Sequence, residues 1–156
     1  MKKNRIYVDT SVIGGCFDEE FYLWSNGLMK DFRLGHFIPV LSGAVAIEIE
    51  KAPLKVREKY YELVDDGAEI VEVNEEVLKL LNVFRKANVL SERFESDMTH
   101  IALATVYQVD ILVSWNFQHI VRFDKISQFN NLSQKAGYKP IAIYSPREVT
   151  HYEEKI

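Results

Sequence analysis

Five short apolar runs, separated by longer segments with helical spacing, limit the fold of this chain more than any other feature. Each run is β-branched in character and bounded by turn residues, as buried strands are. The runs occupy residues 6–8, 37–41, 70–73, 111–113 and 141–143. Strands separated by helices of about ten or more residues need crossover connections, which join parallel strands. The sequence therefore predicts a single α/β domain, with a central parallel sheet of four to five strands that helices flank on both faces.

The segments between these runs carry the signals of helices. Residues 19–35 and 53–67 have apolar side chains at helical spacing, and each segment ends at a glycine, as helices often do. In residues 74–89, Asn74 is the predicted N-cap, and acidic residues follow it in the first turn. Residues 92–108 are mostly apolar in their second half, which predicts a helix that is buried nearly all round.

The composition is that of one globular domain. The chain has 156 residues, of which 47% are apolar and 27% charged, and its net charge is −4. These values argue against disorder, a coiled coil or a broadly basic nucleic-acid binder. No apolar run approaches the roughly 18 residues of a membrane span, and the start of the chain turns acidic too early for a signal peptide. We therefore expect a cytoplasmic protein with one domain over residues 1–149 and a C-terminal tail over residues 150–156.

Three polar residues lie where the strand ends of such a sheet meet. Asp9 follows the first strand in IYVDTSVIGG, and Asn116 is the third residue after the fourth strand in ILVSWNFQHI. Asp97 lies early in the helix that leads into that fourth strand, and such a helix starts near the carboxyl end of the strand that it precedes. Ligands of open α/β sheets bind in the crevice beyond these ends. We therefore expect Asp9, Asp97 and Asn116 to lie together.

Glu48 is the fourth candidate site residue. It lies in the apolar helical segment LSGAVAIEIEKAP, where a charge is costly unless it is paired. Glu50, two residues later, points elsewhere on a helix and is interpreted as a solvated neighbour. Carboxylates packed together without a cation repel one another and destabilise the fold. Oxygen ligands suit Mg²⁺ or Mn²⁺, which would polarise a phosphodiester and lower the pKa of a bound water that attacks phosphorus.

Four stretches, taken in order, resemble the successive blocks of the PIN domain, particularly those of the VapC-type toxin ribonucleases of bacterial toxin-antitoxin pairs. They are IYVDTSVIGG at the start, Glu48 in LSGAVAIEIEKAP, Asp97 in ESDMTHIALATV, and ILVSWNFQHI. The resemblance runs from Ile6 to about Val149, and NNLSQKAGYKPIAIYSPREV is similar to the end of a VapC-like subgroup.

This resemblance implies a PIN-like domain with Mg²⁺- or Mn²⁺-dependent endoribonuclease activity, RNA as substrate, an antitoxin protein as partner, and frequent homodimerisation. By position, four residues match the catalytic and metal-site residues of the family, Glu48 directly or through a water: Asp9, Glu48, Asp97 and Asn116. Ser11 and Ser114 match hydroxyls that support this site. Many PIN domains have aspartates where this chain has Asn116 and Gln118, so we expect weaker metal binding here.

Other interpretations of these residues stay open. Asp9 and Asn116 are residue types that cap helices and turns, and Asp97 suits the start of a helix. Glu48 could be satisfied by a nearby Lys or Arg. His100, one helical turn after Asp97, leaves open a mixed site for Zn²⁺ or Fe²⁺.

Residues near the fourth position also have two interpretations. His119 could touch substrate, but it is interpreted as a residue on a helix surface. Trp115 and Phe117 could stack an unpaired base at the mouth of the site, or they could pack in the interior. At the level of function, the main alternative is a PIN-like RNA-binding or regulatory module without catalysis, and a phosphatase or DNA nuclease with the same metal oxygens is a third possibility.

Overall fold

A five-stranded parallel sheet forms the centre of the molecule in the computed structural model, which describes residues 2–150. The strands lie in the order β3-β2-β1-β4-β5, and each pair of neighbours is parallel. Their bounds are β1 Arg5–Val8, β2 Ile38–Ser42, β3 Glu69–Val71, β4 Ile111–Val113 and β5 Ala142–Tyr144. The predicted α/β class and parallel sheet are confirmed, with strand bounds that move by no more than one or two residues.

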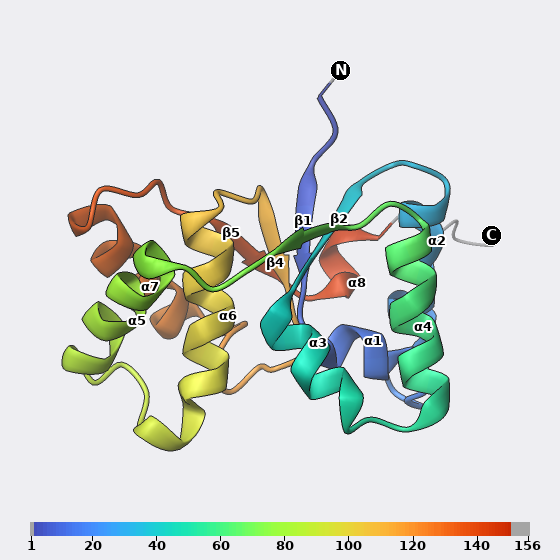
Figure 1. Cartoon of the computed structure of the whole chain (residues 1–156), viewed down its shortest axis with the longest axis horizontal. Coiled ribbons are helices and arrows are strands. Elements are labelled where there is room, and N and C mark those ends of the chain that lie inside the picture. Colours follow the sequence, from blue (N-terminus) through green and yellow to red (C-terminus); the bar gives the residue numbers. More distant parts are fainter. Residues whose placement is uncertain (1, 151–156) are drawn as a thin grey trace.

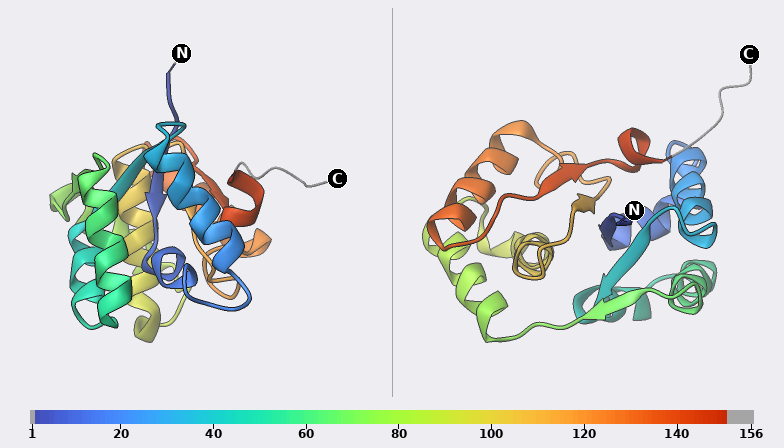
Figure 2. Two further views of the ribbon diagram at one scale, coloured as in Figure 1. Left: turned by 90° about the vertical axis from the view of Figure 1, so that its right-hand side faces the viewer. Right: turned by 90° about the horizontal axis from the view of Figure 1, so that it is seen from above.

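Helices cover both faces of the sheet. Figure 1 shows α5, α6 and α7 on one side and α1, α2 and α4 on the other, and the view from above in Figure 2 separates the same two groups. The helices are α1 Thr10–Gly15, α2 Tyr22–Arg33, α3 Gly43–Glu50, α4 Leu54–Asp65, α5 Glu75–Lys86, α6 Glu95–Val106, α7 Phe123–Lys135 and α8 Pro146–Val149, with a 3-10 turn at Glu92–Phe94. This two-sided cover is what a parallel sheet requires, because both of its faces are apolar.

Local sequence signals explain where several helices begin and end. Asn74 caps α5, because its side-chain oxygen accepts a hydrogen bond from the backbone N–H of Val77 at 2.9 Å. Gly35 and Gly67 follow α2 and α4 with φ values of +77° and +92°, which glycine adopts without steric cost. Helix α7 was not predicted, although Phe129 in it is buried and Ile126 and Leu132 pack against the core at helical spacing.

The order of the strands places a crevice at the end of β1. The chain runs outward from β1 through β2 to β3 and then crosses to β4 on the other side of β1. Connections that leave a strand in opposite directions open a crevice beyond its carboxyl end, which is where ligands of such sheets bind. The residues directly after β1 and β4 therefore lie side by side at this end of the sheet, where the backbone N–H of Asp9 donates to the carbonyl of Val113 at 3.2 Å.

Strand β1 is the most deeply buried part of the core. Ile6, Tyr7 and Val8 have no exposed surface. Burying a large apolar side chain stabilises a fold by about 1.5–3 kcal/mol, but Tyr7 also carries a hydroxyl that needs a hydrogen-bond partner in the interior. The partners of that hydroxyl belong to the candidate site described below.

The end of the described chain is anchored to the domain. Thr150, which the sequence analysis assigned to the tail, is buried and donates a hydrogen bond from Oγ1 to Oδ2 of Asp31 at 2.8 Å. The rest of the expected tail, residues 151–156, lies outside the described residues. Among residues 2–150, no helix is both long enough and apolar enough to cross a membrane.

Candidate functional site

Asp9 lies at the carboxyl end of β1, in the N-cap position of α1. Its side chain makes no cap hydrogen bond. Instead, its Oδ2 accepts hydrogen bonds from the hydroxyls of Ser11 at 2.8 Å and Ser114 at 2.7 Å. The residue is only 6% exposed, so these hydroxyls replace the water that burial removes. The capping interpretation of Asp9 therefore applies to its backbone position but not to its carboxylate.

The two serines also join the loop after β4 to the start of α1. The Ser11 hydroxyl accepts a hydrogen bond from the backbone N–H of Trp115 at 3.0 Å. The Ser114 hydroxyl accepts one from the backbone N–H of Asn116, also at 3.0 Å. Each serine thus contacts both the Asp9 carboxylate and a backbone N–H of the loop after β4. This is the supporting role that the resemblance implies for them.

His100 occupies the centre of the site and is 1% exposed. Its Nε2 lies 2.5 Å from Oε1 of Glu48 and 3.6 Å from Oδ1 of Asp9. Its Nδ1 shares a 2.7 Å hydrogen bond with the hydroxyl of Tyr7, which shares another of 2.7 Å with the hydroxyl of Ser42. Because Nε2 faces two carboxylates, it must carry a proton. His100 therefore donates to Glu48 and has its ring orientation set by Tyr7.

The surrounding acids favour the charged form of His100. Burial alone would lower the pKa of this imidazole, but the hydrogen bond that it donates to Glu48 and the negative charges of Asp9, Glu48 and Asp97 outweigh burial and raise the pKa above its ordinary value. Three carboxylates thus act on one imidazole ring. The charged imidazolium that they favour would offset part of their mutual repulsion.

Asp97 lies in the first turn of α6 and pairs with a second histidine. Its Oδ2 is 2.9 Å from Nδ1 of His119, and the ring centroid of His119 lies 3.9 Å from that of Phe94. Partial burial raises the pKa of Asp97, the charge of Asp9 adds to this effect, and the hydrogen bond from His119 opposes it. His119 is 8% exposed and lies in a turn, so its interpretation as a residue on a helix surface is wrong.

Asn116 caps the turn that carries His119. Its Oδ1 accepts hydrogen bonds from the backbone N–H groups of Gln118 at 3.1 Å and His119 at 2.9 Å. These two bonds use both lone pairs of the carbonyl oxygen. The capping interpretation of Asn116 therefore describes its role in this arrangement, and its role as a metal ligand stays a prediction.

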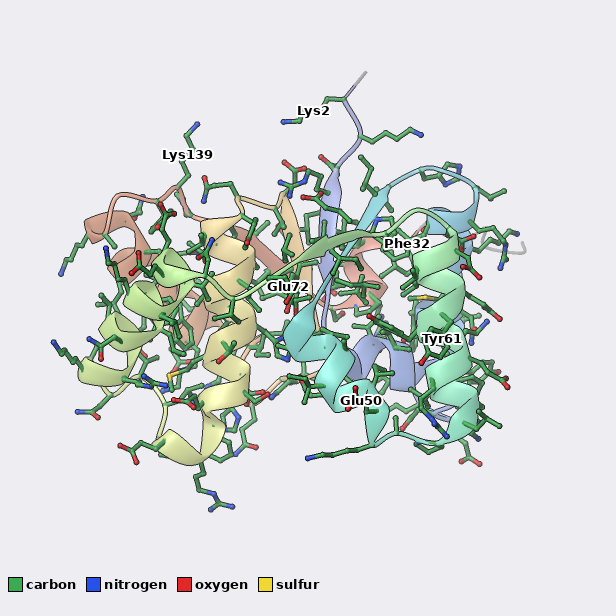
Figure 3. All side chains as sticks on the ribbon, viewed as in Figure 1. Lys2, Phe32, Glu50, Tyr61, Glu72 and Lys139 are labelled. Carbon is green, nitrogen blue, oxygen red and sulfur yellow. The ribbon has the colours of Figure 1, made fainter. Side chains whose placement is uncertain are left out.

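The three acidic side chains approach His100 from different depths. The side chains of Asp9, Asp97 and Glu48 are 9%, 22% and 37% exposed, respectively. Glu48 therefore lies nearest the opening of the site and Asp9 farthest inside. Glu50, on the same helix, is exposed, as its interpretation as a solvated neighbour requires (Figure 3).

The donor set has the chemistry that a hard divalent cation requires, but its present arrangement is not closed around one. The candidate ligands are carboxylate and amide oxygens, which suit Mg²⁺ or Mn²⁺. As the side chains stand within residues 2–150, no group of three or more His, Cys, Asp or Glu residues is arranged to hold a metal ion. Glu48 holds His100 and Asp97 holds His119 instead, so binding of a cation requires these two contacts to loosen.

Sequence reasoning treated the histidines as minor alternatives and did not find Tyr7. His100 follows Asp97 by three residues, which places both on one face of α6. Tyr7 stands between the aliphatic residues Ile6 and Val8, two positions before Asp9. The signal for both was therefore a polar side chain on a buried face, close in sequence to a candidate acid.

Fold and site together define a class of protein: a parallel α/β domain with carboxylates gathered beyond the end of its central strand. No family model matches the sequence, and no curated protein matches it either. Among solved structures, the fold is similar to a chain in the crystal structure of VapBC2 from Rickettsia felis bound to a DNA fragment from their promoter. That match has a TM-score of 0.53 and 12% identity, and it covers 89% of this chain and 96% of the other.

This likeness concerns the fold alone, and it is consistent with the single PIN-like α/β domain that the sequence motifs predict. A second match, to tyrosyl-tRNA synthetase complexed with L-tyrosine from Archaeoglobus fulgidus, has a TM-score of 0.43 and 16% identity, and it covers 93% of this chain and 55% of the other. That score is too low to bear on the assignment of the fold.

Proposed function

We propose that this protein is a PIN-type endoribonuclease that depends on Mg²⁺ or Mn²⁺ and hydrolyses RNA phosphodiesters. The observation that carries the proposal is that Asp9 and Glu48 both face Nε2 of His100, beyond the end of the central strand, and that the charge of Asp97 acts on the same ring. A fold similar to a chain of the VapBC2 complex supports it. A divalent cation bound among these oxygens would polarise the phosphodiester and lower the pKa of a bound water.

The residues of the chain take different parts in this function because they lie at different depths. Asp9, held by two hydroxyls, supplies a fixed oxygen at the bottom of the site. Glu48, the most exposed of the acids, would orient the attacking water by a hydrogen bond. The raised pKa of His100 favours a positive charge between the carboxylates, which would reduce their repulsion of an incoming phosphate.

The proposal includes the biological setting that the resemblance implies. We propose that the protein is the toxin of a toxin-antitoxin pair, is cytoplasmic, forms a homodimer and binds an antitoxin protein over the acidic site. The VapBC2 complex to which the fold is similar is described as bound to a DNA fragment from its promoter. Light scattering at micromolar concentration tests the dimer, since a monomer mass contradicts it.

The activity is tested with RNA and Mn²⁺, with and without EDTA. We expect cleavage that EDTA stops and that Asp9→Asn and Asp97→Asn reduce by about 100-fold or more, because each loses a charged ligand oxygen. Glu48→Gln is expected to lose activity as well. Glu50→Gln is the matched control, because it removes an exposed carboxylate two residues away on the same helix and should cleave normally. If the Asp9 and Asp97 variants cleave as fast as the wild type, the proposed site is wrong.

A second candidate function is an RNA-binding or regulatory module without catalysis. Two observations favour it: the carboxylates hold histidines rather than closing around one point, and the Asn116 oxygen already accepts two backbone hydrogen bonds. Calorimetric titration with Mn²⁺, with and without RNA, separates the two functions. Binding in either condition supports the nuclease, and absence of binding in both supports the module.

A further inference from the structure

Aromatic residues that follow β4 form an ordered cluster beside the acidic site. The Trp115 ring is stacked on Phe21, with centroids 4.1 Å apart and planes 14° apart. Its indole N–H donates a 2.8 Å hydrogen bond to the hydroxyl of Ser25, which donates to the carbonyl of Val12 at 2.7 Å. Trp115 is only 7% exposed. Of the two interpretations of this residue, packing is therefore the one that the structure supports.

Gly15 makes room for the Trp115 ring. A Cβ atom at this position would lie 2.6 Å from the indole nitrogen of Trp115 and 2.6 Å from the Ser25 hydroxyl, which is too close for either contact. The indole thus lies directly against the backbone of α1. Because both its ring and its backbone N–H are held, Trp115 is a rigid support for the residues around it.

Phe117 differs from Trp115 in that half of it is open to solvent. It is 49% exposed, and its ring contacts Trp115 edge-on, with centroids 6.1 Å apart and planes 62° apart. Phe21 supports it from a second direction, at a centroid distance of 6.4 Å. The ring therefore rests on two fixed aromatic side chains and leaves surface available to a ligand.

The position of Phe117 relative to the acids is fixed by the chain. It follows Asn116, whose backbone N–H donates to the hydroxyl of Ser114, and that hydroxyl donates to Asp9. One residue and two hydrogen bonds thus separate the exposed ring from the carboxylate at the bottom of the site. The exposed ring therefore belongs to the turn after β4, at the same end of the sheet as Asp9.

We propose that Phe117 is a stacking platform for an unpaired base of the RNA substrate, next to the phosphate that is cleaved. This inference rests on the proposed function and adds to it a residue that binds the substrate, which is the Phe117 ring. Every base has an aromatic face that can stack on a ring of this kind, whereas a paired base in a helix is not available.

A cationic side chain close to the site, that of Arg93, could bind the phosphate backbone of the same RNA strand. The guanidinium carbon of Arg93 lies 5.3 Å from the ring centroid of Phe94, and that ring contacts His119, the partner of Asp97. Arg93 is exposed and attracts phosphates. An RNA strand that crosses the site thus meets an aromatic ring at the turn after β4 and a guanidinium at the turn before α6.

Binding measured in EDTA tests the platform separately from cleavage. The probe is a fluorescent single-stranded RNA oligonucleotide, compared with the same oligonucleotide carrying one abasic position at each site in turn, and affinity is read by anisotropy. We expect Phe117→Leu to bind about 5- to 100-fold more weakly and Phe117→Trp to retain wild-type affinity, because only the latter keeps a stacking face. One abasic position should weaken the wild type and leave Phe117→Leu unchanged.

Tyr61→Leu is the matched control. Tyr61 lies on α4 (Figure 3), is 59% exposed and contacts Tyr60 edge-on, so the change removes an equally exposed ring away from the site. Its affinity should equal that of the wild type. A Phe117→Leu variant that binds RNA as tightly as the wild type overturns the platform, whether or not the protein cleaves. If Phe117→Leu keeps its affinity but the wild type cleaves RNA, the platform is wrong and the proposed function stands. If the wild type neither binds nor cleaves RNA, the platform and the proposed function are both wrong.

Discussion

Removing the Tyr7 hydroxyl tests whether the buried network holds the site together. Tyr7→Phe deletes the oxygen that bonds both His100 Nδ1 and the Ser42 hydroxyl, each at 2.7 Å, in a region with no solvent. Loss of a buried hydrogen bond costs about 0.5–1.5 kcal/mol, and a buried partner left without a bond adds about 1–3 kcal/mol. The ring itself is kept, so packing changes little. We therefore expect the free energy of unfolding to fall by about 2–4 kcal/mol.

Urea denaturation followed by circular dichroism measures this loss. For a domain of this size, it corresponds to a fall in Tm of about 5–15 °C. Tyr138→Phe is the control, because it deletes a hydroxyl that donates to Glu76 at 3.3 Å on the surface, and a change of less than about 0.5 kcal/mol is expected. If Tyr7→Phe is as stable as Tyr138→Phe, the network does not hold His100 and the account of the site is wrong.

Two further predictions concern packing and charge. Gly15→Ala should lower the free energy of unfolding by about 2 kcal/mol or more, because its Cβ would meet the Trp115 ring. Gly14→Ala is the control: nothing lies within 4 Å of the new Cβ, so the change should be neutral or slightly stabilising. Equal melting temperatures of the two variants would contradict the close contact between Gly15 and the Trp115 ring. The raised pKa of His100 gives a contribution to stability that is complete below the unfolded value of about 6.5 and is lost as the pH rises through the higher folded value. Unfolding free energies measured from pH 6 to 9 should therefore fall more steeply in the wild type than in His100→Gln, and parallel curves would refute the charge assignment.

The sheet was predictable because its strands differ from the helices in hydrophobic period. Residues 6–8 and 111–113 are continuous apolar runs, and a parallel sheet buries such runs on both faces. Helix α7 was missed although its sequence carries a helical signal: Ile126, Phe129 and Leu132 recur at three-residue spacing and pack against the core. The signal was overlooked because the polar residues between them outnumber these apolar side chains.

The acids of the site were predictable from position, but their partners were not. The carboxyl ends of parallel strands meet at one edge, and this rule places Asp9 and the turn after β4 together without any coordinates. The part played by His100 depends on facts that sequence does not contain: its burial, the 2.5 Å contact with Glu48, and the hydroxyl of Tyr7 on its other nitrogen. A histidine in an apolar helix can pack in the core, pair with an acid or bind a metal, and only its tertiary contacts determine which of these roles it has.

The amide of Asn116 offers a direct test of how charge sets the balance between histidine and metal in this site. Aspartate caps a turn as well as asparagine does, so Asn116→Asp should keep the hydrogen bonds to Gln118 and His119 and change only the charge. Without metal, a further carboxylate beside the acidic cluster increases repulsion, and we expect a loss of stability of up to about 1 kcal/mol.

With Mn²⁺ the sign should reverse, because the added charge favours the bound cation. Ligand binding stabilises a fold by RT ln(1 + [L]/Kd), so a tenfold tighter site raises the unfolding free energy by up to about 1.4 kcal/mol more than in the wild type. Asn131→Asp, an exposed change on α7, controls for the effect of charge alone. Melting curves in EDTA and in Mn²⁺ separate the two effects. If Asn116→Asp responds to Mn²⁺ no more than Asn131→Asp does, the fourth position is a turn cap only, and affinity for the cation must come from the acids that His100 and His119 now hold.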